Sequence, residues 1–177
     1  MDWYLAFKLV PEQARFLRRR GVTFVEFSRD GRRAYATVPD TGTLAAIDPA
    51  ARQVVGTVNT GEGPEGLAVS PDGRWVLVAN KGGRSVAIVN AADNTLASTI
   101  QTVPQPQRVT MSADGSFAYV SHGEEGRISV IDIGRQAIAG TLFLDNPALG
   151  LALSPDGSRL YAAQQGANSI QAVDAAT

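Results

Sequence analysis

The stretch at residues 61–66 has the spacing of a phosphate-binding loop. The glycines of Gly61-Glu62-Gly63-Pro64-Glu65-Gly66 match G-x-G-x-x-G, the pattern of dinucleotide-binding loops. Such a loop follows a strand and opens a helix, because the helix N-terminus meets the pyrophosphate. Only residues 67–70 separate Gly66 from the next turn, which leaves room for a short strand but not for a helix. We therefore expect these glycines to connect strands and to bind no nucleotide.

Carboxylates form two further patterns with chemical potential. Asp40-Thr41-Gly42 matches the catalytic triplet of aspartic proteases, but that chemistry needs a second carboxylate to share a proton. Other aspartates recur at a fixed spacing and could bind a metal: Asp30, Asp72, Asp114 and Asp156, and Asp48, Asp132 and Asp174. Side chains that cap turns must recur with the fold, whereas an active site is usually built once. We predict a hairpin loop at Asp40 and structural roles for the recurring aspartates.

His122 is the single histidine of the chain. It could act as a general base, as a haem ligand or as a residue of a binding rim. No histidine pair or carboxylate motif at metal-ligand spacing accompanies it, and the absence of cysteine excludes thiolate ligands and disulfides. The rim interpretation is therefore favoured. The motifs predict no catalytic residue, no metal site and no cofactor.

A repeat of 42 residues organises the chain. Asp-Gly pairs occur at 30–31, 72–73, 114–115 and 156–157, each preceded by a serine two residues earlier. Each copy reads as four short strands separated by turn residues, and in the second copy these strands cover 67–69, 75–79, 85–89 and 95–100. Stacked four-stranded units of about 40 residues are typical of a β-propeller. We predict an all-β propeller of four-stranded antiparallel blades, with four blades in this chain.

The copies also carry a recognisable motif. Residues 64–73 read P-E-G-L-A-V-S-P-D-G, residues 119–122 read Y-V-S-H and residues 130–132 read V-I-D. Over about residues 20–177 the chain resembles the YVTN family of β-propeller repeats. The resemblance implies a surface-layer-like or exported bacterial or archaeal protein, related to the propellers of lactonases and of periplasmic redox proteins. It also implies a periplasmic or extracellular location, although the chain shows no signal peptide, so a cytoplasmic protein or a truncated chain stays open.

The repeats divide the chain. We predict an N-terminal strand and short helix over residues 1–19, followed by repeats at about 20–58, 59–100, 101–142 and 143–177. Propellers of the YVTN type usually close with about seven or eight blades. The chain is then a partial arc, half of an eight-bladed dimer, or a ring closed tightly by four blades; the arc is favoured. The strand-like residues 3–10 could complete the fourth blade or pack on an exposed blade face.

Antiparallel blades bring the loops between the second and third strands to the same end as the connections between blades. That end gathers charged residues, namely Glu62, Lys81, Arg84, Glu124 and Glu125. The predicted ligand-binding residues there are Glu65, Asn80, Gln107, Arg108, His122 and Gln164. Arg108 stands where the second and fourth copies have Gly66 and Gly150, at the channel-side start of a strand, and could hold an anionic ligand.

The function predicted from these residues is a non-catalytic scaffold that binds a protein, a surface polymer or a small ligand at its loop-rich end. Exposed blade faces would bind another protein or a second copy of the chain. The alternative is a redox propeller that holds haem d1 or a quinone, or a lactonase-like hydrolase, in an exported enzyme. A net charge of −1 favours no nucleic-acid partner, despite the arginines at 15 and 18–20, and no segment is long enough to span a membrane.

Overall fold

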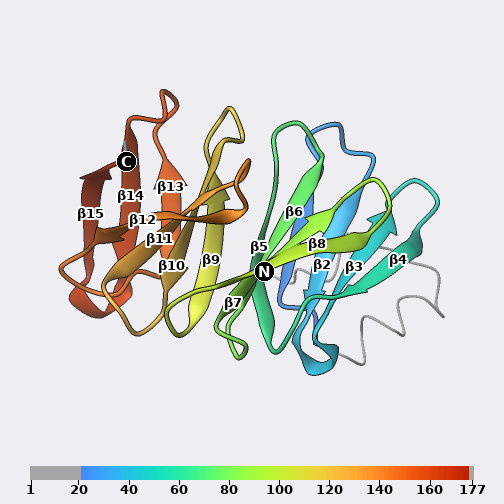
Figure 1. Cartoon of the computed structure of the whole chain (residues 1–177), viewed down its shortest axis with the longest axis horizontal. Helices are drawn as coiled ribbons and strands as arrows, with labels where there is room; N and C mark the ends of the chain where they lie inside the picture. The colour runs from blue at the N-terminus through green and yellow to red at the C-terminus, as the bar shows by residue number, and fades with distance from the viewer. Residues whose placement is uncertain (1–20, 176–177) are drawn as a thin grey trace.

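The computed structural model describes residues 21–175, which form four separate antiparallel sheets (Figure 1). We call these sheets blades 1 to 4. Blade 1 contains β1 (Phe24–Phe27), β2 (Ala34–Val38), β3 (Thr43–Asp48) and β4 (Gln53–Asn59). Blade 2 contains β5 (Pro64–Val69), β6 (Trp75–Asn80), β7 (Ser85–Asn90) and β8 (Thr95–Gln101). Blade 3 contains β9 (Pro106–Met111), β10 (Phe117–His122), β11 (Arg127–Asp132) and β12 (Ala137–Phe143), and blade 4 contains β13 (Gly150–Leu153), β14 (Arg159–Gln164) and β15 (Ser169–Asp174).

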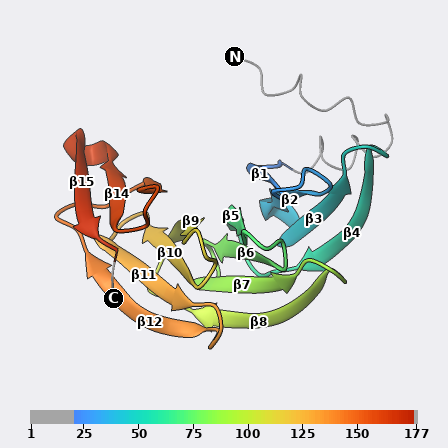
Figure 2. The same cartoon turned by 90° about the horizontal axis from the view of Figure 1, so that it is seen from above.

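The blades stand side by side in an arc. Figure 2 shows β1, β5 and β9 on the concave side and β4, β8 and β12 on the convex side. Within each blade the strands pair in sequence order, so each is a meander. The predicted fold class, an all-β partial propeller of antiparallel blades, is confirmed. The predicted N-terminal strand and helix lie outside the described residues.

The Asp-Gly pairs form similar turns, one in each blade, between the first and second strands. The serine two residues before each aspartate donates a hydrogen bond from its hydroxyl to the Asp carboxylate. The same hydroxyl oxygen accepts the amide hydrogen of the residue five positions later, at or next to the start of the following strand. The four glycines have φ between 70° and 73°, a left-handed conformation that glycine adopts without strain. Because these hydrogen bonds favour the ionised carboxylate, the pKa values of Asp114 and Asp156 are lowered to about 2. The recurring Asp30, Asp72, Asp114 and Asp156 hold turns, as predicted.

Both sequence motifs of the opening stretch lie in connections. Asp40 belongs to a single 3-10 turn (Pro39–Thr41) between β2 and β3, and Gly42 ends it with φ 66°. The glycine-rich stretch leads into β5, which begins at Pro64, three residues before the predicted start, because Pro64 already pairs with Asn80 beyond an irregularity in the ladder. A strand follows Gly63 where a dinucleotide site needs a helix. The phosphate-binding interpretation is therefore excluded by the local fold.

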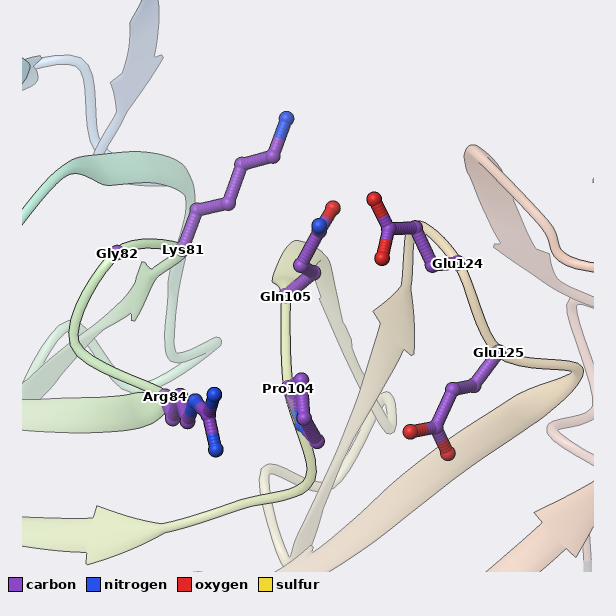
Figure 3. A pocket seen from close by; sticks show the side chains of 7 residues that line it. All are labelled: Lys81, Gly82, Arg84, Pro104, Gln105, Glu124 and Glu125. Carbon is purple, nitrogen blue, oxygen red and sulfur yellow. The ribbon is translucent and has the colours of Figure 1, made fainter.

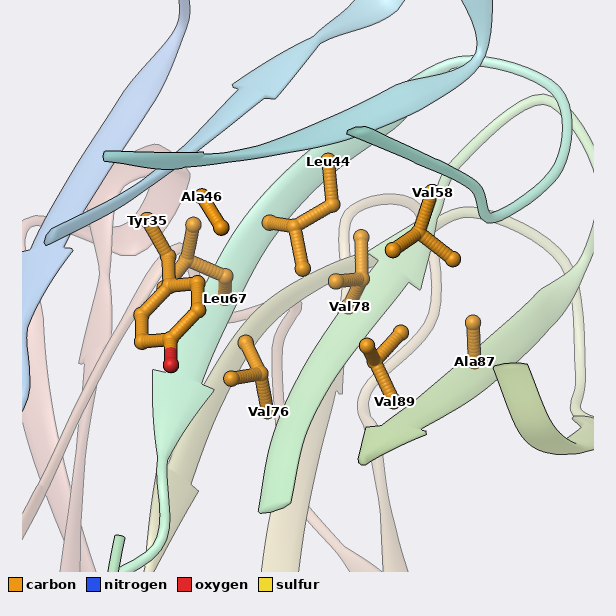
Figure 4. Packing of buried hydrophobic residues seen from close by; sticks show 9 residues of the cluster. All are labelled: Tyr35, Leu44, Ala46, Val58, Leu67, Val76, Val78, Ala87 and Val89. Atoms are coloured by element: carbon orange, nitrogen blue, oxygen red, sulfur yellow. The ribbon is translucent and has the colours of Figure 1, made fainter. Parts of the chain in front are cut away.

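The core lies between neighbouring blades. On β6, Val76 and Val78 face blade 1, while Leu77 and Ala79 face blade 3, as the two-residue period of a strand requires. Figure 4 shows the first of these interfaces, where side chains of blades 1 and 2 interdigitate. Both faces of blades 2 and 3 are covered in this way, which explains their almost uninterrupted apolar strands. The inner strands are thereby held at fixed positions along the concave side.

Candidate functional site

One position of the repeat lies on the first, inner strand of every blade. It is occupied by Phe24 on β1, Gly66 on β5, Arg108 on β9 and Gly150 at the start of β13. Large and small side chains therefore alternate from blade to blade. A Cβ atom on Gly66 would lie 2.3 Å from the Gln107 carbonyl oxygen, so β5 and β9 approach each other closely at this point. Only glycine fits between the two strands here.

The missing side chain of Gly66 lets Arg108 reach across blade 2. Its guanidinium carbon lies 4.1 Å from the centre of the Phe24 ring, within the range of a cation–π contact. Its Nη1 atom lies 3.7 Å from Glu65 Oε1 and donates a hydrogen bond to the Gln107 carbonyl. Thr37 holds Glu65 in turn, since its hydroxyl donates to the Glu65 carbonyl at 2.7 Å. The guanidinium is thus fixed by the inner strands of three blades, and we call Phe24, Glu65 and Arg108 the channel-side cluster.

This cluster brings together two of the six residues predicted to bind a ligand. Phe24 was missed, although its repeat position, which it shares with Gly66 and Arg108, was readable in the sequence. The cation is only partly buried, with 29% of the Arg108 side chain accessible. A site of this kind can attract an anion to the concave side. Ligand binding by Glu65 and Arg108 stays a prediction.

A second repeat position, at the end of the second strand, carries a polar side chain directed into the blade in blades 2 to 4, whereas blade 1 has Val38 there. Asn80 donates from Nδ2 to the Thr60 carbonyl at 2.7 Å and to Ser85 Oγ at 3.1 Å. Gln164 donates from Nε2 to the Asn146 carbonyl at 3.0 Å and to Gln171 Oε1 at 2.8 Å. Each side chain thereby ties the connection between two blades to its own blade. We call Asn80, His122 and Gln164 the clamp residues.

His122 is fully buried, so the expectation of a rim residue is wrong. Its Nδ1 lies 3.0 Å from the Pro104 carbonyl oxygen and its Nε2 lies 2.9 Å from Ser129 Oγ. A carbonyl can only accept, so Nδ1 carries the proton and Nε2 accepts the Ser129 hydroxyl hydrogen. Burial lowers the pKa of His122, which keeps the ring neutral. With both nitrogens engaged, the ring has no lone pair to offer to a ligand in this conformation.

Gln107 is also buried, beside Arg108 on β9. Its Oε1 accepts no hydrogen bond within the part of the chain that the structure describes. A Cβ atom on Gly123 would lie 2.5 Å from this oxygen, so the amide packs directly under the loop after β10. Gln107 therefore lies between the channel-side cluster and the loop-rich end.

The loop-rich end forms as predicted and contains a pocket of about 420 Å³. Lys81 and Arg84 come from the loop after β6, Glu124 and Glu125 come from the loop after β10, and Pro104 and Gln105 lie between them (Figure 3). Glu125 is paired with Arg127 at 3.2 Å. The pocket therefore has a basic and an acidic side. A smaller hollow that shares Lys81, Gly82 and Gln105 extends from it to Glu65.

Metal-binding groups are not clustered in this structure. No group of three or more His, Cys, Asp or Glu side chains that could hold a metal ion occurs among residues 21–175. Tyr119 is buried, and its hydroxyl donates to the Ala175 carbonyl at 2.9 Å. Within the same residues, no helix is long and apolar enough to cross a bilayer.

Comparisons with known proteins place the fold in context. One of the many solved structures that match is a chain of Kuenenia stuttgartiensis Hydrazine Synthase, with 27% identity and a TM-score of 0.83. The match covers 88% of this chain and 46% of that one, so this chain spans about half the length of its structural relative. No curated protein matches the sequence. The family model described as "Cytochrome D1 heme domain" matches residues 23–111, half of the chain. The chain therefore belongs to the cytochrome D1 heme domain family.

Proposed function

We propose that this chain forms one side of a propeller channel that binds a redox cofactor or a similar anionic small molecule. The channel-side cluster carries this proposal. Phe24, Glu65 and Arg108 all lie within the residues that match the family model, and they place a fixed, partly exposed cation on the concave side. Arginine pairs well with carboxylates, because its planar fork donates two parallel hydrogen bonds.

The family implies haem d1, and the described residues fit only part of that group. Arg108 is suited to a carboxylate at the edge of a tetrapyrrole. Haem iron, in contrast, needs an axial His, Cys, Met or Tyr ligand. Within residues 21–175, both nitrogens of His122 are engaged and the Tyr119 hydroxyl is bonded to a backbone carbonyl. Tyr35 and Met111 pack in the apolar interfaces between blades, Tyr161 lies on the side of blade 4 that faces away from blade 3, and the chain has no cysteine. The proposed role is therefore that of a non-catalytic wall that binds and orients, while iron ligation is supplied from elsewhere.

A titration with porphyrins tests this role. The purified chain is mixed with haem d1, with protohaem and with metal-free protoporphyrin IX, and binding is followed by visible absorbance. We expect the metal-free porphyrin to bind about as tightly as the iron forms, because the described residues direct no axial ligand to the channel. Arg108→Gln should weaken binding about tenfold or more, as expected when a charge-assisted hydrogen bond is lost.

Arg135→Gln is the matched control, because Arg135 is an exposed arginine paired with Asp132 outside the concave side. If no porphyrin binds, or if Arg108→Gln and Arg135→Gln behave alike, the proposal is wrong. A much tighter affinity for the iron forms would show that an axial ligand exists after all.

The loop-rich end supports a second role in binding. Its pocket places Lys81 and Arg84 opposite Glu124 and Glu125, an arrangement that suits a polar segment of a partner protein or a zwitterionic small molecule. Charge reversal at Lys81 and Arg84 should abolish such partner binding in a pull-down and leave porphyrin binding unchanged.

We also propose that the repeats are of the YVTN type and that the protein is exported, since both follow from the resemblance of the repeat motif.

A further inference from the structure

The outer face of blade 4 exposes apolar side chains in a regular pattern. Tyr161 on β14 is 42% accessible and Ile170 on β15 is 73% accessible. Both belong to the set of strand positions that face away from blade 3, because Leu160 and Ala162 pack towards it. Exposed aromatic and branched aliphatic residues on one sheet face mark an interaction surface.

The repeat shows what this face is built to contact. Tyr119 and Ile128 occupy the same positions of blade 3, 42 residues earlier, and they are 3% and 0% accessible. They are buried because blade 4 covers them with an apolar cluster that includes Leu151 and Leu153 of its inner strand. By the same repeat, Tyr161 and Ile170 are suited to pack against the inner strand of a further blade of this kind.

The opposite end of the arc presents such a surface. Val25 and Phe27 on β1 occupy the repeat positions of Leu151 and Leu153 and are 44% and 46% accessible. The remaining large exposed apolar residues of the described chain lie on the outer strands, namely Val55, Leu96, Ile138 and Phe143. Exposure of the apolar blade faces is thus confined to the two end blades.

We propose that two copies of this chain associate head to tail, with Tyr161 and Ile170 of one copy packed on Val25 and Phe27 of the other, and with the same contact repeated at the other junction. Two arcs would then close an eight-bladed ring around a shared channel. Two observations favour a second copy as the occupant. The four blades form an open arc in Figure 2, and the chain covers 46% of a structural relative that it matches at a TM-score of 0.83.

The contact on blade 1 is confined to its inner strand. Ala34, Ala36 and Ile47 face the same side from β2 and β3, but they are already buried in a small cluster with Val22 and Val54. Among the described residues, Val25 and Phe27 of β1 are the large apolar side chains that stay exposed on this face, so the proposed contact is made with β1. A head-to-tail contact that does not close gives filaments, whereas closure after two copies gives a defined dimer.

Sedimentation velocity of the full chain, from about 1 μM to about 100 μM, tests the proposal. We expect a species of twice 18.6 kDa that grows at the expense of the monomer. A tail variant (Tyr161→Asp with Ile170→Asp) and a head variant (Val25→Asp with Phe27→Asp) should each raise the dissociation constant at least about tenfold. The control variant, Leu96→Asp with Ile138→Asp, changes comparably exposed residues on outer strands and should dimerise like the wild type. Circular dichroism establishes that each variant is folded.

Mixing the head and tail variants identifies the geometry. A head-to-tail pair keeps one intact junction between the unmodified tail of one variant and the unmodified head of the other, so the mixture should regain a heterodimer. A tail-to-tail dimer would show no such rescue. The proposal is overturned by a chain that stays monomeric throughout, by a dimer that both end variants leave intact, by absence of rescue, or by growth into filaments.

This inference deepens the proposed function, since a channel needs its second half, but the two can fail separately. Association is read from mass and cofactor binding from absorbance. A dimer that binds no porphyrin would contradict the proposed function alone, and a monomer that binds porphyrin through Arg108 would contradict the head-to-tail ring alone.

Discussion

Replacing His122 by alanine tests whether the clamp residues stabilise the propeller. The ring is fully buried and makes two hydrogen bonds, to the Pro104 carbonyl and to the Ser129 hydroxyl. Its removal leaves both partners without their bond and opens a cavity between the blade and the connection it holds. Each unsatisfied buried partner costs about 1–3 kcal/mol and the cavity adds to this, so we expect a loss of about 3 kcal/mol.

Thermal and urea unfolding of the full chain measure this loss. For a domain of this size, 1 kcal/mol lowers Tm by about 2–4 °C, so His122→Ala should lower Tm by about 6–12 °C. Ser129→Ala removes one partner alone, and the double variant should show a coupling energy of about 1 kcal/mol. Glu124→Ala, on the neighbouring loop, is the control and should leave Tm nearly unchanged. An unchanged Tm for His122→Ala, or no coupling energy with Ser129, would refute the stabilising role of the clamp residues.

The remaining predictions concern pH and packing. Burial lowers the pKa of His122, so the unfolded chain binds a proton there more readily than the folded chain, and the free energy of unfolding should fall as pH drops below the ordinary value of 6.5. His122→Asn should remove this pH dependence, which is measured by comparing urea midpoints at pH 7 and 5.5. The pKa of Asp114 is lowered to about 2, so its ionised carboxylate stabilises the folded state above pH 4, and this contribution is lost between about pH 4 and 2. Asp114→Asn should therefore reduce the loss of stability over this acidic range, measured by the same urea midpoints. Gly66→Ala would place a Cβ atom against the Gln107 carbonyl and should cost about 1–3 kcal/mol in denaturant unfolding, whereas Gly166→Ala, with nothing within 4 Å, should be neutral.

The His122 comparison must be made between variants and not read from the wild type alone. Burial raises the pKa of Glu26, so this carboxyl stabilises the folded state below its ordinary value of 4.5 and loses that contribution as pH rises. Its effect on stability has the opposite sign to that of His122. The difference between wild type and His122→Asn cancels Glu26 and isolates the imidazole. A difference that is the same at both pH values would contradict the assignment.

Much of the fold could be predicted because the same pattern of strands and turns occurs four times in the sequence. The Ser-x-Asp-Gly turns combine a side chain that caps the turn with a glycine in the left-handed region, so their positions fix where each hairpin lies. The loop-rich end followed from antiparallel pairing alone. The start of β5 was missed by three residues because a proline at the head of a strand pairs beyond an irregularity in the ladder, which the local pattern does not show.

The side-chain site was harder to predict. Asn80, His122 and Gln164 share a repeat position, and polar residues at a strand end suggest an exposed rim. Their burial depends on the connection from the preceding blade, which folds back over them and offers its carbonyl groups. The contact between Arg108 and Phe24 spans two blades and depends on how closely β5 and β9 approach. Sequence spacing shows the alternation of large and small residues but not the distance across it.

The central claim is that this chain supplies half of a cofactor-binding channel. Size-exclusion chromatography with light scattering and full absorbance spectra, run on the chain after incubation with haem d1, tests it most directly. The account predicts visible absorbance that co-elutes with a species of twice 18.6 kDa and that is clearly reduced in Arg108→Gln. A monomeric peak without visible absorbance would contradict it.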